Sequence, residues 1–203
     1  MPLFFTGFAR HRLARTGVVE IVVATGTQSG ARLRDGSSVT IRPIVPTDAP
    51  LLVDAFERLS LTSRHQRFLG SKTSLTPSEL RRFTIVDHHD HEALIAISTV
   101  DGRAVGVARY VRSSRTSHLA DVAVTVIDEW QRRGLASVLV DRLAARARAE
   151  GIEVVSALVA DDNAGALALL HRAPARAEIV DGGFGVTEYA IDIREPGPRP
   201  VRR

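Results

Sequence analysis

The sequence predicts a mixed α/β domain in which a layered sheet is covered by helices. Short apolar runs rich in β-branched residues have the length of strands, and Ala/Leu-rich segments such as 133–149 repeat with helical periodicity. A third observation is the order strand, turn, helix, strand between Leu119 and Ala160, which predicts a right-handed parallel unit. We therefore expect the order strand, helices, hairpin, strand, helix, strand, helix, hairpin.

Composition excludes several classes of function. The 203 residues include 44% hydrophobic side chains, enough to bury a core, and no apolar run is long enough to cross a membrane. Cysteine is absent, which excludes disulfides, Cys-ligated zinc and thiol catalysis, and is typical of a cytoplasmic protein. The net charge of +4 comes almost entirely from scattered arginines, with Lys72 as the sole lysine. This pattern argues against nucleic acid as a partner and is compatible with an anionic ligand.

The two ends of the chain are the least informative. Residues 1–36 are interpreted as an extension, either flexible or a docking or dimerising arm, so a homodimer is left open. Within it, residues 26–36 are rich in Gly, Ser and Thr and predict a linker or loop. The domain is expected over residues 37–195, and the Pro/Arg-rich residues 196–203 are expected to be disordered.

The first half of the domain predicts one strand and three helices. Residues 38–43 alternate as a strand does, and Pro43 ends it. A helix follows with Thr47 or Asp48 as its N-cap, then a short helix at 64–69. A third helix begins at Thr76-Pro77-Ser78-Glu79, where a cap, a first-turn proline and an acidic residue coincide.

The second half supplies most of the sheet. Residues 92–100 and 104–111 predict a hairpin around Asp101-Gly102, and 119–127 predicts a central buried strand. Helix 133–149 should end at Gly151, strand 152–160 follows, and Asp161-Asp162-Asn163 should cap a helix to about Arg172. Strands at 177–180 and 186–193 should turn at Gly182-Gly183.

The stretch Val122–Ala136 carries the functional signal. An apolar strand passes through Gln131-Arg132-Arg133-Gly134 into a long helix. The first amides of a helix have no intrahelical partner, and the helix dipole makes that end positive. Gly134 permits close approach of the backbone, and the two arginines add charge. This arrangement predicts a phosphate or pyrophosphate site.

These motifs, in this order, resemble the GCN5-related N-acetyltransferase (GNAT) family over about Val39 to Ile193. The family signature Gln/Arg-x-x-Gly-x-Gly/Ala is matched by Gln131, Gly134 and Ala136. Further matches to bacterial protein lysine acetyltransferases are Ile41-Arg42-Pro43, the stretches 59–68 and 105–110, and Glu129-Trp130. The resemblance implies a mostly antiparallel central sheet flanked by helices and acetyl-CoA as co-substrate.

The resemblance also implies site residues. The pyrophosphate would bind the amides of Arg132, Arg133, Gly134, Leu135, Ala136 and Ser137, the pantetheine arm would bind the backbone of Val124, Thr125 and Val126, and Asn163 would contribute from the next helix. An amine acceptor is protonated at neutral pH and needs a base. Asp121 occupies the position where the family commonly has a glutamate, with His118 as a substitute and a strand-end contact as the alternative role. Where many members have an acidic tyrosine, this chain has Leu170, with His171 beside it.

Two other features remain ambiguous in the sequence. Arg109 and Tyr110 either line the acceptor side or lie on a hairpin face with the arginine solvated. The histidines at 88, 89 and 91 are crowded in one loop, but a closed metal site would need strand or helix geometry to orient them, so no metal is expected.

The favoured function is therefore acetyl transfer from acetyl-CoA to a protein lysine. A small-molecule amine acceptor is the alternative within the enzyme class. A catalytically weak acyl-CoA-binding regulatory module is the alternative outside it.

Overall fold

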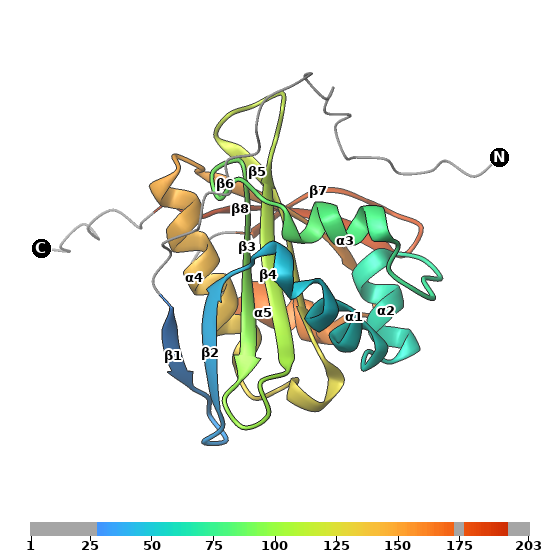
Figure 1. The fold of residues 1–203 in the computed structure, drawn as a ribbon. Helices are drawn as coiled ribbons and strands as arrows, with labels where there is room; N and C mark the ends of the chain where they lie inside the picture. The colour runs from blue at the N-terminus through green and yellow to red at the C-terminus, as the bar shows by residue number, and fades with distance from the viewer. Residues whose placement is uncertain (1–27, 173–176, 195–203) are drawn as a thin grey trace, which may run out of the picture.

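Eight strands form a single sheet in the part of the chain that the structure describes, with helices on both faces (Figure 1). This computed structural model describes residues 28–172 and 177–194. The strands are β1 (Ser29–Arg32), β2 (Ser38–Pro43), β3 (His91–Ser98), β4 (Ala104–Arg112), β5 (Leu119–Val126), β6 (Val154–Ala160), β7 (Ala177–Gly183) and β8 (Val186–Asp192). The helices are α1 (Ala49–Glu57), α2 (Leu61–Phe68), α3 (Pro77–Thr84), α4 (Leu135–Ala149) and α5 (Ala164–Arg172), with short 3-10 turns at Pro46–Asp48 and Asp128–Trp130.

The sheet order β1-β2-β3-β4-β5-β6-β8-β7 is antiparallel at every step but one. Strands β5 and β6 are parallel, because α4 returns the chain between them. The predicted parallel unit and the mostly antiparallel sheet are therefore both confirmed. Among the described residues, no helix combines the length and the apolar character needed to cross a membrane.

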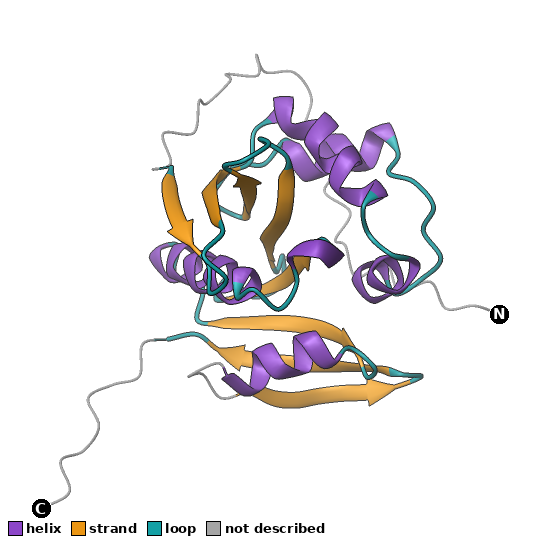
Figure 2. Cartoon of the chain, turned by 90° about the horizontal axis from the view of Figure 1, so that it is seen from below, coloured by secondary structure: helices purple, strands orange, loops and turns teal. Residues whose placement is uncertain are grey.

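Alternation along β4 assigns the two faces of the sheet. Gly106 faces α4, since a Cβ built on it would lie 3.1 Å from Leu139 and 3.3 Å from Leu135. Ala108 and Tyr110 follow on that face and are fully buried. Val107 and Arg109 point to the opposite face, which carries α1, α2 and α3 (Figure 1). Helix α5 lies along the half of the sheet formed by β6, β8 and β7 (Figure 2).

The two parallel strands separate soon after they meet. Pairing joins Leu119, Ala120 and Asp121 of β5 to Val154, Val155 and Ser156 of β6, and it stops there. Beyond Asp121, β5 stays paired with β4 as far as Val126, while β6 stays paired with β8 as far as Ala160. The result is a strand gap, bordered by residues 122–126 on one side and 157–160 on the other.

Most predicted helix ends are confirmed. Thr76 and Glu79 form a reciprocal capping box at the start of α3, and Gly151 follows α4 with a φ of 75°. Asn163 caps α5, because its Oδ1 accepts a hydrogen bond from the Ala166 amide at 3.0 Å. Asp48 precedes α1 but is used differently: its carboxylate binds Arg42 at 2.6 Å and the Val45 amide at 2.9 Å.

The predicted loop at residues 26–36 is wrong for 29–32, which form β1. Its pairing with β2 extends from Ser29 opposite Ile41 to Arg32 opposite Ser38. The sequence of β1 is polar because the strand is an exposed sheet edge held by backbone bonds, so periodicity gives no signal. Leu33 follows it and is buried at 6% exposure.

The last hairpin turns later than predicted. Gly182 and Gly183 continue β7, and the turn is formed by Phe184 and Gly185, with φ angles of 57° and 80°. Two residues with positive φ make the turn type that best matches the twist of a two-residue hairpin. A register shift between Ile179 and Asp181 delays the turn beyond the glycine pair.

Candidate active site

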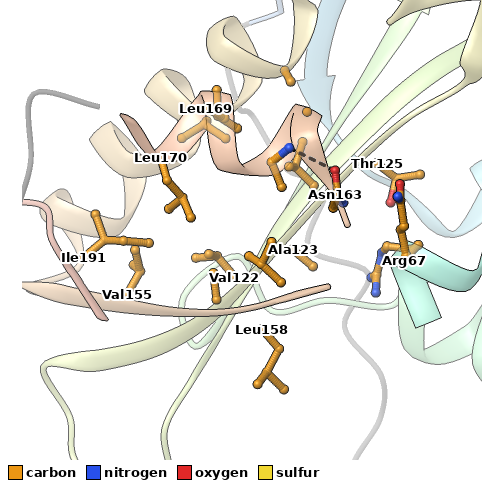
Figure 3. A pocket seen from close by; sticks show the side chains of 18 of the residues that line it. Arg67, Val122, Ala123, Thr125, Val155, Leu158, Asn163, Leu169, Leu170 and Ile191 are labelled. Carbon is orange, nitrogen blue, oxygen red and sulfur yellow. Dashed lines mark hydrogen bonds between the residues drawn. The ribbon is translucent and has the colours of Figure 1, made fainter. Parts of the chain in front are cut away.

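A cleft of about 3190 Å³ extends along the strand gap and is lined from both faces of the sheet (Figure 3). Helices α4 and α5 line it on one face, and α2 and α3 line it on the other. Its volume exceeds the roughly 300–1,000 Å³ of an ordinary small-ligand site, so it can hold two substrates at once.

The turn between β5 and α4 has the geometry of an anion site. Arg132 and Gly134 have φ angles of 61° and 91°, and such left-handed residues turn successive amides toward one point. Within the described chain, no backbone carbonyl accepts a hydrogen bond from the amides of residues 132–137. The N-terminus of α4 adds positive potential at the same place. The predicted residues therefore do form an amide-lined loop, which we call the phosphate loop.

The β1–β2 hairpin covers the phosphate loop, a feature that sequence analysis missed. Arg34 lines the cleft, and its Nε would lie 3.3 Å from a Cβ on Gly134. The Arg34 amide also donates to the Arg133 carbonyl at 3.2 Å. On the other side of the hairpin, Arg142 of α4 donates to the carbonyls of Ser29 and Gly30 at 3.1 and 3.0 Å. The cationic side chain of Arg34 thus reaches the anion site from the β1–β2 hairpin, whose sequence contains no recognisable motif.

The side chain of Arg133 does not take the role that the sequence suggests. Its guanidinium binds Asp35 at 2.9 Å, donates to the Glu129 carbonyl at 2.6 Å and stacks over the Trp130 ring at 4.9 Å. Arg133 is not among the residues that line the cleft, whereas Arg132 is. The Arg133 side chain therefore holds the conformation of the loop, and only its backbone amide is available to an anion.

The β5 side of the strand gap offers free backbone groups. Val124, Thr125 and Val126 line the cleft, and their β6-facing edge has no strand partner. The Val126 carbonyl already accepts from Gln131 Nε2 at 3.1 Å. Asn163 lies across the gap, and its side-chain amide nitrogen remains available because the cap uses Oδ1 (Figure 3).

Asp121 lies on the α2–α3 face, where pairing ends. It opposes Val111 of β4 and Ser156 of β6, and all three line the cleft. Partial burial raises the pKa of Asp121 above its ordinary value, and the nearby Glu188 carboxylate raises it further. Glu188, held by Ser156 Oγ at 2.5 Å, is a site residue that sequence analysis missed. No motif marks it, because β8 joins the site only through its antiparallel pairing with β6.

The two histidines that the sequence offers as further catalytic candidates lie outside the cleft. His118 precedes β5 and does not line the cleft, and neither does the exposed His171. Leu170 does line it and packs in the core with Val155 and Ile191. Asp121 is therefore the residue among these candidates that the fold places in the cleft.

Arg109 and Tyr110 separate onto opposite faces. Tyr110 is fully buried under α4, and its hydroxyl donates to the His89 carbonyl at 2.9 Å. Arg109 lines the cleft on the α2–α3 face and is 7% exposed. Of the two alternatives for Arg109, the solvated arginine is wrong, because α3 covers this part of β4. The Arg109 guanidinium lies 4.5 Å from the centre of the Phe83 ring.

The crowded histidines have separate partners. His88 Nδ1 contacts Glu92 at 2.8 Å, and His89 pairs with Glu150, the residue that follows α4. His91 packs against Arg109, with 3.4 Å between the two nitrogens. Across residues 28–172 and 177–194, no three His, Cys, Asp or Glu side chains meet in a group that could hold a metal ion.

The central part of the chain matches a known family of proteins. Residues 59–173 match the model of the acetyltransferase (GNAT) family, which is more than half of the chain. The chain belongs to this family. The matched segment contains β5, the phosphate loop and Asn163, but not the β1–β2 hairpin.

Two curated relatives match parts of the chain. An acetyltransferase of Pseudomonas aeruginosa is 35% identical over 59% of this chain and 64% of its own length. The acetyltransferase Pat of Mycolicibacterium smegmatis is 27% identical over 89% of this chain and 53% of its own length. This chain therefore spans less than two thirds of each of these two relatives.

Solved structures share the fold. The GNAT domain of S. lividans PAT superposes with a TM-score of 0.75 at 31% identity, covering 81% of this chain and 96% of that one. A cAMP-binding acyltransferase from Mycobacterium smegmatis gives 0.58 at 25% identity, covering 83% of this chain and 48% of that one.

Proposed function

We propose that this protein is an acetyl-CoA-dependent N-acetyltransferase in which Asp121 is the general base. One observation carries the proposal: the strand gap joins an amide-lined phosphate loop to a carboxylate on the opposite face of the sheet. A nucleotide thioester could bind along this path, with its phosphates at one end and its acyl group near the carboxylate.

The residues fit acetyl-CoA by their own chemistry. The unpaired amides at 132–137 and the guanidinium of Arg34 suit a pyrophosphate, and the edge of β5 suits the two amides of pantetheine. The Asn163 side-chain nitrogen is a further donor across the gap. Bound acetyl-CoA would supply an activated acetyl group, with the CoA thiolate as the leaving group.

Asp121 makes the amine nucleophilic. The acceptor nitrogen loses a proton to the Asp121 carboxylate, directly or through water, and forms a bond to the acetyl carbon. The carbon–sulfur bond breaks, and the thiolate takes a proton from water. Leu170, which stands where many family members have a tyrosine, has no proton to donate. The raised pKa of Asp121 makes it a stronger base than an ordinary aspartate.

For the acceptor we propose a protein lysine, supported by the resemblance to bacterial protein lysine acetyltransferases and by the likeness to the S. lividans PAT domain. One observation favours a small amine as the second candidate. The acceptor side is enclosed under α2 and α3 and carries buried charge, which a small polar molecule can match more closely than an extended lysine side chain.

Acetyl-CoA turnover with Asp121→Asn tests the proposal. We expect kcat/KM to fall about 10²- to 10⁴-fold, with acetyl-CoA affinity unchanged. In the native protein the rate should rise with pH as Asp121 loses its proton, and that rise should lie above the ordinary aspartate range because its pKa is raised. Asp101→Asn, in the exposed β3–β4 turn, is the matched control. Equal rates for native and Asp121→Asn protein would remove Asp121 as the base, and tight acetyl-CoA binding without any turnover would favour the regulatory module.

A further inference from the structure

We propose that the acceptor amine carries an anionic group, a carboxylate or a phosphate, a few bonds from its nitrogen, and that Arg109 and Arg67 bind this group. The inference rests on the proposed acetyl transfer and develops its second candidate acceptor, the small amine, because a lysine within a protein has no anionic group so close to its side-chain nitrogen.

Arg109 is a buried cation without a buried anion. In the described part of the chain, no carboxylate oxygen lies within 4 Å of its guanidinium, although an arginine at 7% exposure is normally paired. Its polar contacts are long, 3.3 Å to the Phe83 carbonyl and 3.4 Å to His91 Nε2. A guanidinium has five N–H donors, so most of its capacity remains for a ligand in the cleft.

A second arginine approaches the same place from α2. Arg67 lines the cleft near Thr125 (Figure 3), and it too has no carboxylate partner among the described residues. Burial lowers the pKa of Arg67 to about 10, and burial together with Arg67 and Arg82 lowers the pKa of Arg109 to about 9. Both side chains remain cations at neutral pH. They repel one another, and a bound anion would relieve that repulsion.

Nearby groups do not supply the missing anion. His91 is uncharged, because burial and Arg109 lower its pKa to about 4. The closest acidic residue on α3 is Glu79, which is engaged by Lys72 at 2.7 Å and by the Thr76 cap at 2.9 Å. The cofactor phosphates do not explain the two arginines either, since the phosphate loop leads into α4 on the opposite face of the sheet.

The acceptor side thus has a cationic end and an anionic end. Arg109 is paired in register with Ala123, two residues from Asp121 on the same face. Diagonal neighbours of this kind have Cβ atoms about 7 Å apart, so both side chains can reach one small molecule. Asp121 and Glu188 would receive the amine, while Arg109 and Arg67 hold the anion. An amino acid carries an amine and a carboxylate on one small molecule.

The test compares amines that differ only in charge. Each standard amino acid is offered as the free acid and as its α-carboxamide, and lysine peptides are offered with acidic or neutral neighbours. We expect kcat/KM to favour the acid at least 100-fold in the native protein. Arg109→Gln and Arg67→Gln should each reduce this preference about 10- to 100-fold, the range for a charge-assisted hydrogen bond. Arg81→Gln, which removes an exposed charge from α3 outside the cleft, should leave the preference unchanged.

The acid-to-amide ratio is insensitive to partial unfolding, because both substrates meet the same fraction of folded enzyme. Equal use of acids and amides by the native protein, or a preference that survives both arginine substitutions, would overturn the inference. A preference seen only with peptides, whose acidic neighbour lies many bonds from the lysine nitrogen, would also overturn the inference and would favour a protein lysine as the acceptor. Calorimetric binding of the free acids in the presence of CoA gives a second readout: binding that depends on Arg109 without any turnover would uphold the anion site and refute acetyl transfer.

Discussion

Replacing Gly134 by aspartate tests the phosphate loop most directly. Gly134 has a φ of 91°, and the new Cβ would lie 3.3 Å from Arg34 Nε. Left-handed backbone costs a non-glycine residue about 1–2 kcal/mol. The carboxylate would also repel a bound pyrophosphate by about 4 kcal/mol for one pair of charges at 4 Å and an effective dielectric constant of 20. That repulsion alone corresponds to about a 1,000-fold weaker affinity for CoA.

Gly102→Asp separates this repulsion from backbone strain. Gly102 has a comparable φ of 70°, lies in the β3–β4 turn and has no neighbouring atom within 4 Å of an added Cβ. We expect both variants to lose similar stability in thermal unfolding, and only Gly134→Asp to lose CoA binding in isothermal titration calorimetry. Unchanged CoA affinity in a folded Gly134→Asp protein would refute the loop assignment. Equal losses of affinity in both variants would show that strain, rather than the site, is responsible.

Three further predictions concern stability, measured by chemical denaturation. The pKa of His91 falls from 6.5 to about 4 on folding, so the unfolded state binds more protons between these two pH values. The free energy of unfolding should therefore drop by up to about 3 kcal/mol as pH falls from 6.5 to 4. His91→Gln should abolish this contribution. Gly106→Val should cost about 2 kcal/mol, because a Cβ already meets Leu139 at 3.1 Å; an unaffected midpoint would contradict the packing. Arg146→Met should cost about 3 kcal/mol, because it leaves the fully buried Glu92 without its main cation, and Glu92→Gln in the same background should recover part of that loss.

The fold was predictable where local physics and the tertiary structure agree. The capping box at Thr76 and Glu79 and the N-cap at Asn163 are local, so the sequence alone identifies them. Strand β1 is different, because its residues carry no apolar pattern and depend on β2 and Arg142 for their conformation. Such an edge strand can be recognised only when the positions of its tertiary partners are known.

The site divides in the same way. The phosphate loop is one continuous segment, so a motif can reveal it. The acceptor side is assembled from α2, β4, β5 and β8, and its members Arg67 and Glu188 have no shared spacing in the sequence. The sequence marks Arg109 as a candidate, but the burial of its side chain depends on α3, which periodicity does not position over β4.

The separation of β5 from β6 has a consequence for solubility. A sheet edge with unpaired backbone groups invites pairing with another chain, and this protein has two such edges inside its own sheet. Both edges face the same cleft, which is lined by α2 on one face of the sheet and by α5 on the other. An extended ligand that bonds to the edge of β5 would act as a partial ninth strand. By mass action it would also stabilise the native state, so the folded fraction of this protein would depend on the ligand supply.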